Sequence, residues 1–265
     1  MRLPVALTVA GSDSGGGAGI QADLKTFAAL GVHGTSAITA VTAQDTLTVE
    51  AILEMPPSLI EAQIRMVVED LAPAAAKTGM LSSEAVIVAV VGALRQGGPS
   101  LLVVDPVMVA KGGARLLREE AVGALRSLLI PLATVLTPNI PEAEVLLGRT
   151  IETLDERRRA AEDLRALGPA TVVLKGGHAR DDAIDIVFDG DRMIELGAAR
   201  HGTTNTHGSG CAFSAAITAW LARGLTPIDS VSRAKRFIDG AIAASLEVGR
   251  GHGPVNPMWD VPRPD

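Results

Sequence analysis

The segment Thr204-Asn205-Thr206-His207-Gly208-Ser209-Gly210-Cys211 is followed at once by an apolar run from Ala212 to Ala222. The first half is polar and glycine-rich and does not suit the interior of a strand. The second half is rich in alanine, favours a helix, and is closed by Gly224. We therefore predict a loop that leads directly into a buried helix.

The junction between this loop and this helix is a candidate anion site. The first backbone N–H groups of a helix have no partner within the helix, and the helix dipole adds positive charge there. Gly208 and Gly210 lack Cβ atoms, so a phosphoryl group could approach the amides of residues 208–211 closely. The sequence thus predicts an anion hole formed by Gly208, Ser209, Gly210 and Cys211.

The only cysteine of the chain, Cys211, stands at the edge of this predicted hole. A thiol beside a helix N-terminus tends to have a lowered pKa, so Cys211 is a candidate general base or nucleophile. A simpler interpretation stays open, in which a glycine-rich helix start lies beside a small buried cysteine.

Composition limits the classes of function. The chain has 265 residues, of which 47% are hydrophobic, and a formal net charge of -6. It has no basic runs and no aromatic belts, so we expect small metabolites as ligands and no nucleic-acid or membrane partner. One cysteine cannot form an internal disulfide, and the first apolar run, residues 3–10, is broken by Pro4 and is interpreted as a strand and not as a secretory signal. The longest apolar stretch, residues 85–94, is too short to span a membrane. We expect a cytoplasmic protein.

Predicted strands and helices alternate along the whole chain, which has no linker or repeat. This pattern favours a single three-layer α/β domain over residues 1–265 with a mainly parallel central sheet. The Asp189-Gly190 turn lies between the runs of residues 184–188 and 193–196. This pattern predicts a hairpin, and therefore antiparallel edge strands. The predicted strands cover residues 5–10, 35–41, 49–53, 74–77, 101–105, 133–137, 171–174, 184–188 and 193–196.

Capping residues mark most predicted helix starts. Ser58 with Glu61 has the pattern of a capping box, and we also expect helix starts at Ser82 or Ser83, at Thr153 with Glu156, and at Thr226 before Pro227. A further helix is predicted over residues 116–130.

Polar side chains follow the first strands where the sheet is expected to bind ligands. The loop of residues 11–19 lacks the ending of a P-loop and the spacing of a dinucleotide site, so we interpret it as a loop that admits a small ligand or as a tight turn. Asp23 lies one turn into the next helix and is predicted to face the same cleft, or only to favour the helix dipole. Gln44 follows the second strand and could contact an edge of the substrate.

Further candidates follow later strands. Asp105 ends a fully apolar strand and is a metal or phosphate-chemistry candidate. Asn139 and Glu142 could orient a hydrated magnesium ion, or simply form a capping box. Lys175 is a cation in a glycine-rich turn on the same side of the sheet.

Five motifs together resemble the hydroxymethylpyrimidine/phosphomethylpyrimidine kinases of thiamine biosynthesis, which are members of the ribokinase-like superfamily. The motifs spread over nearly the whole chain and occupy residues 10–23, 41–44, 105–108, 137–143 and 205–211. The resemblance implies a ribokinase-like sandwich and ATP-dependent, magnesium-dependent phosphorylation of 4-amino-5-hydroxymethyl-2-methylpyrimidine, then of its monophosphate to the diphosphate.

The resemblance also implies a role for individual residues. Cys211 would be the base, at a position where the wider superfamily has aspartate. The pyrimidine pocket would be lined by Gly11, Asp23, Gln44, Met80 and Val107; ATP would be contacted by Lys175 and the strand near Thr203; and magnesium would be held or oriented by Asp105, Asn139 and Glu142. Two departures are Ser209, where the family often has threonine, and Lys111-Gly112-Gly113-Ala114, a looser form of the expected Lys-Ser-Gly-Asp lid loop.

Three other functions stay open at this point. The first is a pyridoxal or pyridoxine kinase, and the second is a catalytically silent pyrimidine-binding regulator. The third is a cysteine hydrolase that would use Cys211 and His207, for which no third orienting group is evident. The sequence leaves the oligomeric state open, including a homodimer.

Overall fold

The computed structural model describes residues 3–110, 112–177, 184–197 and 201–262, and these form an α/β sandwich around one sheet. Within these residues the sheet has nine strands in the order β3-β2-β1-β4-β5-β6-β7-β8-β9. Neighbouring strands are parallel from β2 to β7, whereas β3, β8 and β9 pair antiparallel at the two edges. The strands are β1 (Val5–Asp13), β2 (His33–Gln44), β3 (Val49–Glu54), β4 (Ala75–Thr78), β5 (Leu102–Val104), β6 (Val135–Leu136), β7 (Thr171–Leu174), β8 (Ile184–Phe188) and β9 (Met193–Gly197).

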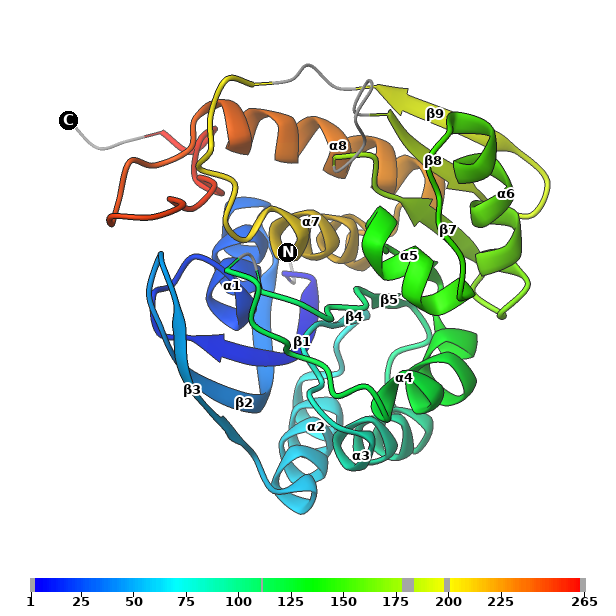
Figure 1. The fold of residues 1–265 in the computed structure, drawn as a ribbon. Coiled ribbons are helices and arrows are strands. Elements are labelled where there is room, and N and C mark those ends of the chain that lie inside the picture. Colours follow the sequence, from blue (N-terminus) through cyan, green and yellow to red (C-terminus); the bar gives the residue numbers. More distant parts are fainter. Residues whose placement is uncertain (1–2, 111, 178–183, 198–200, 263–265) are drawn as a thin grey trace.

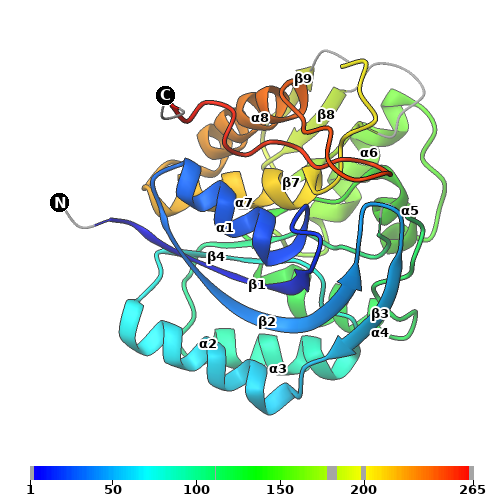
Figure 2. The same ribbon diagram turned by 90° about the vertical axis from the view of Figure 1, so that its left-hand side faces the viewer.

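Helices cover both faces of this sheet, as Figures 1 and 2 show. One face carries α1 (Gly19–Ala29), α7 (Ser209–Ala222) and α8 (Pro227–Ala243). The other face carries α2 (Pro57–Leu71), α3 (Glu84–Arg95), α4 (Ala121–Ala124), α5 (Ile140–Leu147) and α6 (Leu154–Arg165). Helix α4 continues into a π-helical turn, Leu125–Leu129, and a 3-10 turn, Ile130–Leu132. The predicted three-layer α/β architecture with a mainly parallel sheet is thus confirmed.

The apolar strands of the sheet are buried on both faces, because helices cover both sides. Alternate residues of a strand point to opposite sides and so pack against different helical layers. On β1, Ala6 packs toward α1 and α7, whereas Leu7 and Val9 pack toward the opposite helical layer. On β5, Val103 packs toward the layer of α1 and α7, and Val104 packs toward the opposite layer. The apolar runs of Val, Leu and Ala form the central parallel strands, as predicted. The carboxyl ends of these strands lie at the same edge of the sheet.

Most predicted helix starts are confirmed. Thr153 and Glu156 form a complete capping box at α6. The hydroxyl of Thr226 accepts a hydrogen bond from the Asp229 N–H at α8, and Ser83 caps α3 in the same way. The hairpin at Asp189-Gly190 is also confirmed, with β8 and β9 on either side.

Two boundary predictions are wrong. Helix α2 begins at Pro57 and has no side-chain cap, so Ser58 and Glu61 do not form the predicted capping box. The helix predicted over residues 116–130 begins only at Ala121, because the N–H groups of Leu116 and Leu117 donate to the carbonyl of Met108 instead. Lys111 of the predicted lid loop lies outside the described residues. No helix in the described part of the chain is long and apolar enough to cross a membrane.

Candidate active site

A cavity of about 610 Å³ opens at the carboxyl edge of the parallel strands, between the loop after β1 and the start of α7. This volume is typical of sites for small molecules. Twelve of the residues predicted to bind ligands line it: Gly11, Gln44, Met80, Asp105, Val107, Asn139, Glu142, Lys175, Gly208, Ser209, Gly210 and Cys211. The structure therefore gathers residues from seven segments of the chain at one place.

Two predicted site residues do not line this cavity. Asp23 is fully buried, where its carboxylate binds the Nζ of Lys77 at 2.9 Å and the hydroxyl of Thr8 at 2.6 Å. The hydroxyl of Thr203 lies 3.1 Å from that of Ser245, away from the cavity wall. The prediction that Asp23 faces the cleft is therefore wrong, because a buried cation on β4 holds its side chain inside the protein.

The start of α7 has the backbone geometry expected of an anion hole. Gly208 is the N-cap residue with a φ of 74°, and a Cβ atom there would lie 1.8 Å from the carbonyl oxygen of Gly17. Only glycine fits this position. The N–H of Ser209 already donates to the carbonyl of Thr206 at 3.2 Å. Among the described residues no acceptor occurs for the N–H groups of Gly208, Gly210 and Cys211, which leaves them available to an anion.

The thiol of Cys211 does not have the lowered pKa expected from its sequence position. Burial raises the pKa of Cys211 to about 12, against the opposing charge of Lys77. The carboxylates of Asp23 and Asp105 raise it further. Desolvation therefore outweighs the helix dipole, and the thiol is protonated at neutral pH in the ligand-free protein.

Lys175 and Asp105 form an ion pair beside the start of α7. The Nζ of Lys175 lies 3.0 Å from Oδ1 of Asp105, and a Cβ atom on Gly210 would come within 3.4 Å of that Nζ. Hydroxyls of Thr137 and Ser214 also donate to the Asp105 carboxylate, at 3.1 and 3.3 Å. Burial lowers the pKa of Lys175, but nearby carboxylates outweigh that effect and raise it overall. Lys175 is therefore a cation next to the helix start, and its charge is paired with that of Asp105.

Asn139 and Glu142 form the predicted capping box at α5. The side chain of Asn139 accepts from the Glu142 N–H at 2.9 Å, and the side chain of Glu142 accepts from the Asn139 N–H at 2.8 Å. Burial and the charge of Asp105 raise the pKa of Glu142 to about 7, although Lys175 opposes them. The capping interpretation is therefore confirmed. No cluster of three or more His, Cys, Asp or Glu side chains placed to hold a metal ion occurs in the described ranges.

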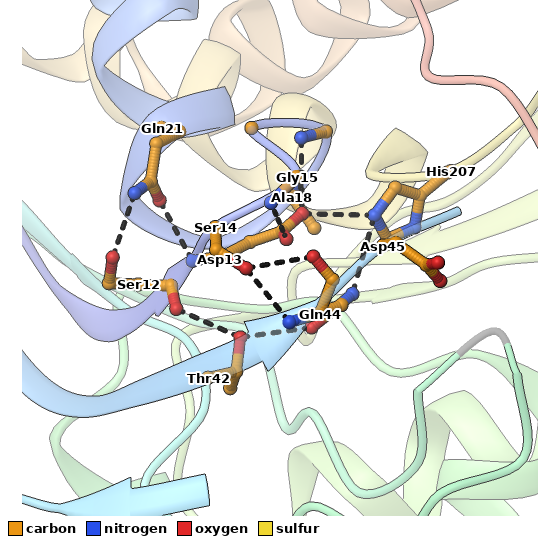
Figure 3. Close-up of polar contacts among 12 residues, drawn as sticks. Ser12, Asp13, Ser14, Gly15, Ala18, Gln21, Thr42, Gln44, Asp45 and His207 are labelled. Carbon is orange, nitrogen blue, oxygen red and sulfur yellow. Dashed lines mark hydrogen bonds and ion pairs between the residues drawn. The ribbon is translucent and has the colours of Figure 1, made fainter. Parts of the chain in front are cut away.

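Asp13 and His207 connect two loops of the site, and sequence reasoning gave neither of them a binding role. The Nε2 of His207 lies 3.0 Å from Oδ2 of Asp13, and Gln44 lies beside His207 (Figure 3). Lys77 was likewise missed, since a lysine in a short apolar strand gives no sign of its partner. For Asp13 and His207 the sequence did contain a signal. Asp13 lies within the first glycine-rich loop, and His207 directly precedes the second.

Comparison with known proteins agrees with this geometry. The family model described as phosphomethylpyrimidine kinase matches residues 13–256. A Bacillus subtilis (strain 168) hydroxymethylpyrimidine/phosphomethylpyrimidine kinase is 48% identical over 258 residues, which are 97% of this chain and 95% of that protein.

Two solved structures are similar over most of the chain. The phosphomethylpyrimidine kinase of Clostridium difficile 630 has 43% identity and a TM-score of 0.81, and the match covers 91% of this chain and all of that one. An ADP complex of Bacillus subtilis pyridoxal kinase has 39% identity and a TM-score of 0.91, with 97% and 98% of the two chains covered.

Proposed function

The chain belongs to the phosphomethylpyrimidine kinase family, and from this premise we propose that it transfers phosphoryl groups from ATP to a hydroxymethylpyrimidine. The substrates are 4-amino-5-hydroxymethyl-2-methylpyrimidine and its monophosphate, and the product is the diphosphate used in thiamine biosynthesis. The observation that carries the proposal is the start of α7, where three free amides face a cavity that also contains Lys175. One domain over residues 1–265 and a cytoplasmic location belong to the same proposal.

The geometry suits phosphoryl transfer because this reaction needs positioning and charge stabilisation more than covalent chemistry. The amides of Gly208, Gly210 and Cys211 would stabilise charge on the transferred group, and they are already fixed by the helix. Lys175, held by Asp105, would bind phosphate oxygens of ATP. The apolar wall from Met80 and Val107 would pack against the pyrimidine ring.

Cys211 is proposed as the base that takes the proton of the substrate hydroxyl. This role requires the thiolate, which burial disfavours in the ligand-free site and which the charge of Lys77 favours. If Cys211 is the base, turnover should rise with pH through the neutral and alkaline range.

Magnesium is proposed as the metal. Its preferred oxygen donors are present at Asp105, Asn139 and Glu142, all of which line the cavity. The single side-chain oxygen of Asn139 and one oxygen of Glu142 already accept hydrogen bonds at α5, so these residues would supply only part of the coordination, and ATP phosphates and water the rest. When bound, the ion would neutralise charge on the phosphates.

Pyridoxal is a second candidate substrate, because the fold is also similar to a pyridoxal kinase over nearly the whole chain. A coupled assay of ADP release with hydroxymethylpyrimidine, its monophosphate and pyridoxal distinguishes the alternatives. We expect turnover with both pyrimidines. Turnover with pyridoxal alone would contradict the proposal, and turnover with none of the three would favour a silent pyrimidine-binding regulator.

A further inference from the structure

A glycine-rich segment near the C-terminus, residues 249–255, crosses the tip of the β2–β3 hairpin, and we call it the strap. Figure 2 shows it in red above this tip and beside the yellow segment that leads into α7. The hydroxyl of Thr46 accepts from the N–H groups of Arg250 and Gly251, at 3.2 and 3.0 Å. The carbonyl of Thr46 accepts from the N–H of His252 at 3.2 Å. One threonine of the hairpin therefore binds three successive amides of the strap.

Glycines let the strap approach its neighbours this closely. A Cβ atom on Gly251 would lie 2.1 Å from the carbonyl oxygen of Thr46. A Cβ atom on Gly253 would lie 2.9 Å from Oδ1 of Asn205 and 2.1 Å from the carbonyl oxygen of Leu246. Such distances exclude a side chain at either position. The spacing of these glycines thus has a packing reason, which is the contact of the strap with the hairpin on one side and with Asn205 on the other.

The strap also binds the loop that leads into α7. Oδ1 of Asn205 accepts from the N–H of Gly253 at 2.9 Å. The N–H of His207 donates to the carbonyl of Gly253 at 3.1 Å, and the carbonyl of His207 accepts from the N–H of Val255 at 3.1 Å. These bonds form a short parallel bridge centred on His207 and Pro254. Three hydrogen bonds therefore hold residues 205–207 against the strap.

This loop has no free space on its other side. A Cβ atom on Gly17 would lie 2.4 Å from the ring of His207, and a Cβ atom on Gly208 would lie 1.8 Å from the carbonyl oxygen of Gly17. The loop is thus packed between the strap and the first glycine-rich loop. Because Gly208 is the N-cap of α7, the position of this loop decides where the first amides of α7 lie.

We propose that Thr46 and Asn205 are positioning residues that act through the strap and fix the free amides at the start of α7. This inference rests on the proposed function, in which those amides stabilise the transferred phosphoryl group. Neither residue lines the cavity, so each would act without touching a ligand. A small displacement of the amides should lower the rate of transfer. Pyrimidine affinity should persist, because Ser14 holds the backbone of Gln44 independently of the strap, with two bonds of 2.8 Å.

The first test measures turnover with ATP and pyrimidine affinity by titration calorimetry. Thr46→Val removes the hydroxyl with little change of shape, and Asn205→Ala removes the acceptor at the other end of the strap. Each should lower kcat by about tenfold or more and change the dissociation constant of hydroxymethylpyrimidine by less than about twofold. Thr46→Ser keeps a hydroxyl and Asn205→Asp keeps an oxygen acceptor, so both should retain the wild-type kcat.

A double variant tests whether the two residues act through the same segment. Thr46 binds amides of residues 250–252, whereas Asn205 binds that of Gly253. Two independent effects would multiply to about a hundredfold loss, but two breaks in one strap should cost little more than one. Thr153→Val is the matched control. Its hydroxyl accepts from the Glu156 N–H at 3.2 Å at α6, outside the cavity, so this variant should lower stability and keep kcat.

Amide hydrogen exchange gives a readout that does not depend on activity. The N–H groups of His207 and Val255 both donate within the contact between strap and loop. Their exchange should be about tenfold faster in Thr46→Val and in Asn205→Ala, and unchanged in Thr153→Val.

Four results would overturn the inference: wild-type exchange in both variants, wild-type kcat in both, a double variant whose loss equals the product of the single losses, or an equal loss of kcat in Thr153→Val. If the wild-type protein phosphorylates no pyrimidine but exchange rises as expected, the proposed function fails, and the strap still positions the start of α7.

Discussion

The Nζ of Lys77 lies 2.9 Å from both carboxylate oxygens of Asp23, and neither side chain is exposed to solvent. This pair joins β4 to α1 beneath the site, and its charges act on the thiol of Cys211. Burial lowers the pKa of Lys77, but the adjacent charges raise it overall, so the lysine is a cation. Asp23 is thus a partner of this cation and not a ligand of the cavity.

Removing one member of this pair should destabilise the protein strongly. Lys77→Met leaves the Asp23 carboxylate buried without its cation, so we expect the free energy of unfolding to fall by about 3 to 5 kcal/mol. Urea denaturation measures this change. Arg65→Ala breaks an exposed pair with Glu69 and should cost less than about 1 kcal/mol. Equal losses in the two variants would contradict the assignment.

The reactivity of Cys211 should report its raised pKa. Because it is the only cysteine, the rate of alkylation by iodoacetamide measures this thiol alone in the folded protein. With a pKa of about 12, the rate should rise about tenfold per pH unit from pH 7 to 10. A plateau above pH 8 would show instead that the helix dipole lowers the pKa.

Replacement of Cys211 distinguishes two roles of this residue, that of a general base and that of a structural side chain. Cys211→Ala should leave ATP binding nearly intact, because the proposed anion hole consists of backbone amides, and reduce turnover by roughly two to four decades. Cys211→Asp should keep part of the activity, because a carboxylate can accept the same proton. Full turnover of Cys211→Ala at saturating ATP and pyrimidine would remove the base role and leave the kinase assignment intact.

Glu142 should make stability depend on pH. Its carboxyl has a pKa of about 7 in the folded protein and 4.5 as a model group, so the folded state binds this proton more tightly. The stabilisation by the Glu142 proton is therefore fully present below pH 4.5. It declines between pH 4.5 and 7 and has been lost above pH 7. The decline should be about 3 kcal/mol. Urea unfolding of Glu142→Gln should lack it.

The same Glu142→Gln variant tests the metal role. If Glu142 orients magnesium, its replacement should lower turnover and raise the magnesium concentration needed for half-maximal rate. A lower melting temperature with unchanged magnesium dependence would leave capping of α5 as the role of this residue.

Gln44 should contribute to substrate affinity. Gln44→Leu removes an amide from the cavity wall, which should raise the KM for hydroxymethylpyrimidine by roughly one to two decades. Gln63 makes two hydrogen bonds with the backbone of Ile38 outside the cavity, so Gln63→Leu is the matched control and should affect stability only. An unchanged KM in Gln44→Leu would exclude Gln44 from the pocket.

Gly208 should tolerate no side chain. Gly208→Ala places a Cβ atom 1.8 Å from the carbonyl oxygen of Gly17, so the start of α7 must shift and turnover should fall by about two decades or more. Gly224 also has a positive φ, of 87°, but has no atom near its Cβ position. Gly224→Ala should therefore lower stability and keep full turnover per folded molecule, which separates backbone strain from the steric clash.

The sequence alone determined the layers, the strands and the glycine-rich start of α7. Alternating apolar runs and helix caps are local signals, and a glycine-rich loop before a helix predicts free amides whatever surrounds it. The pattern of Asn139 and Glu142 predicted the capping box because both partners lie within one turn. The positions of Gln44 and Lys175 in the cavity followed from motifs at the carboxyl ends of parallel strands, and that of Cys211 followed from the glycine-rich start of a helix.

The tertiary structure decided which charges meet and how deeply they are buried. Asp23 and Lys77 lie 54 residues apart in the chain, and Asp13 and His207 lie 194 apart, so no local pattern relates them. The pKa of Cys211 depends on desolvation by surrounding layers, which a helix position cannot reveal. Pairing of buried polar groups is a long-range property, because each group binds whichever partner the packed elements bring to it.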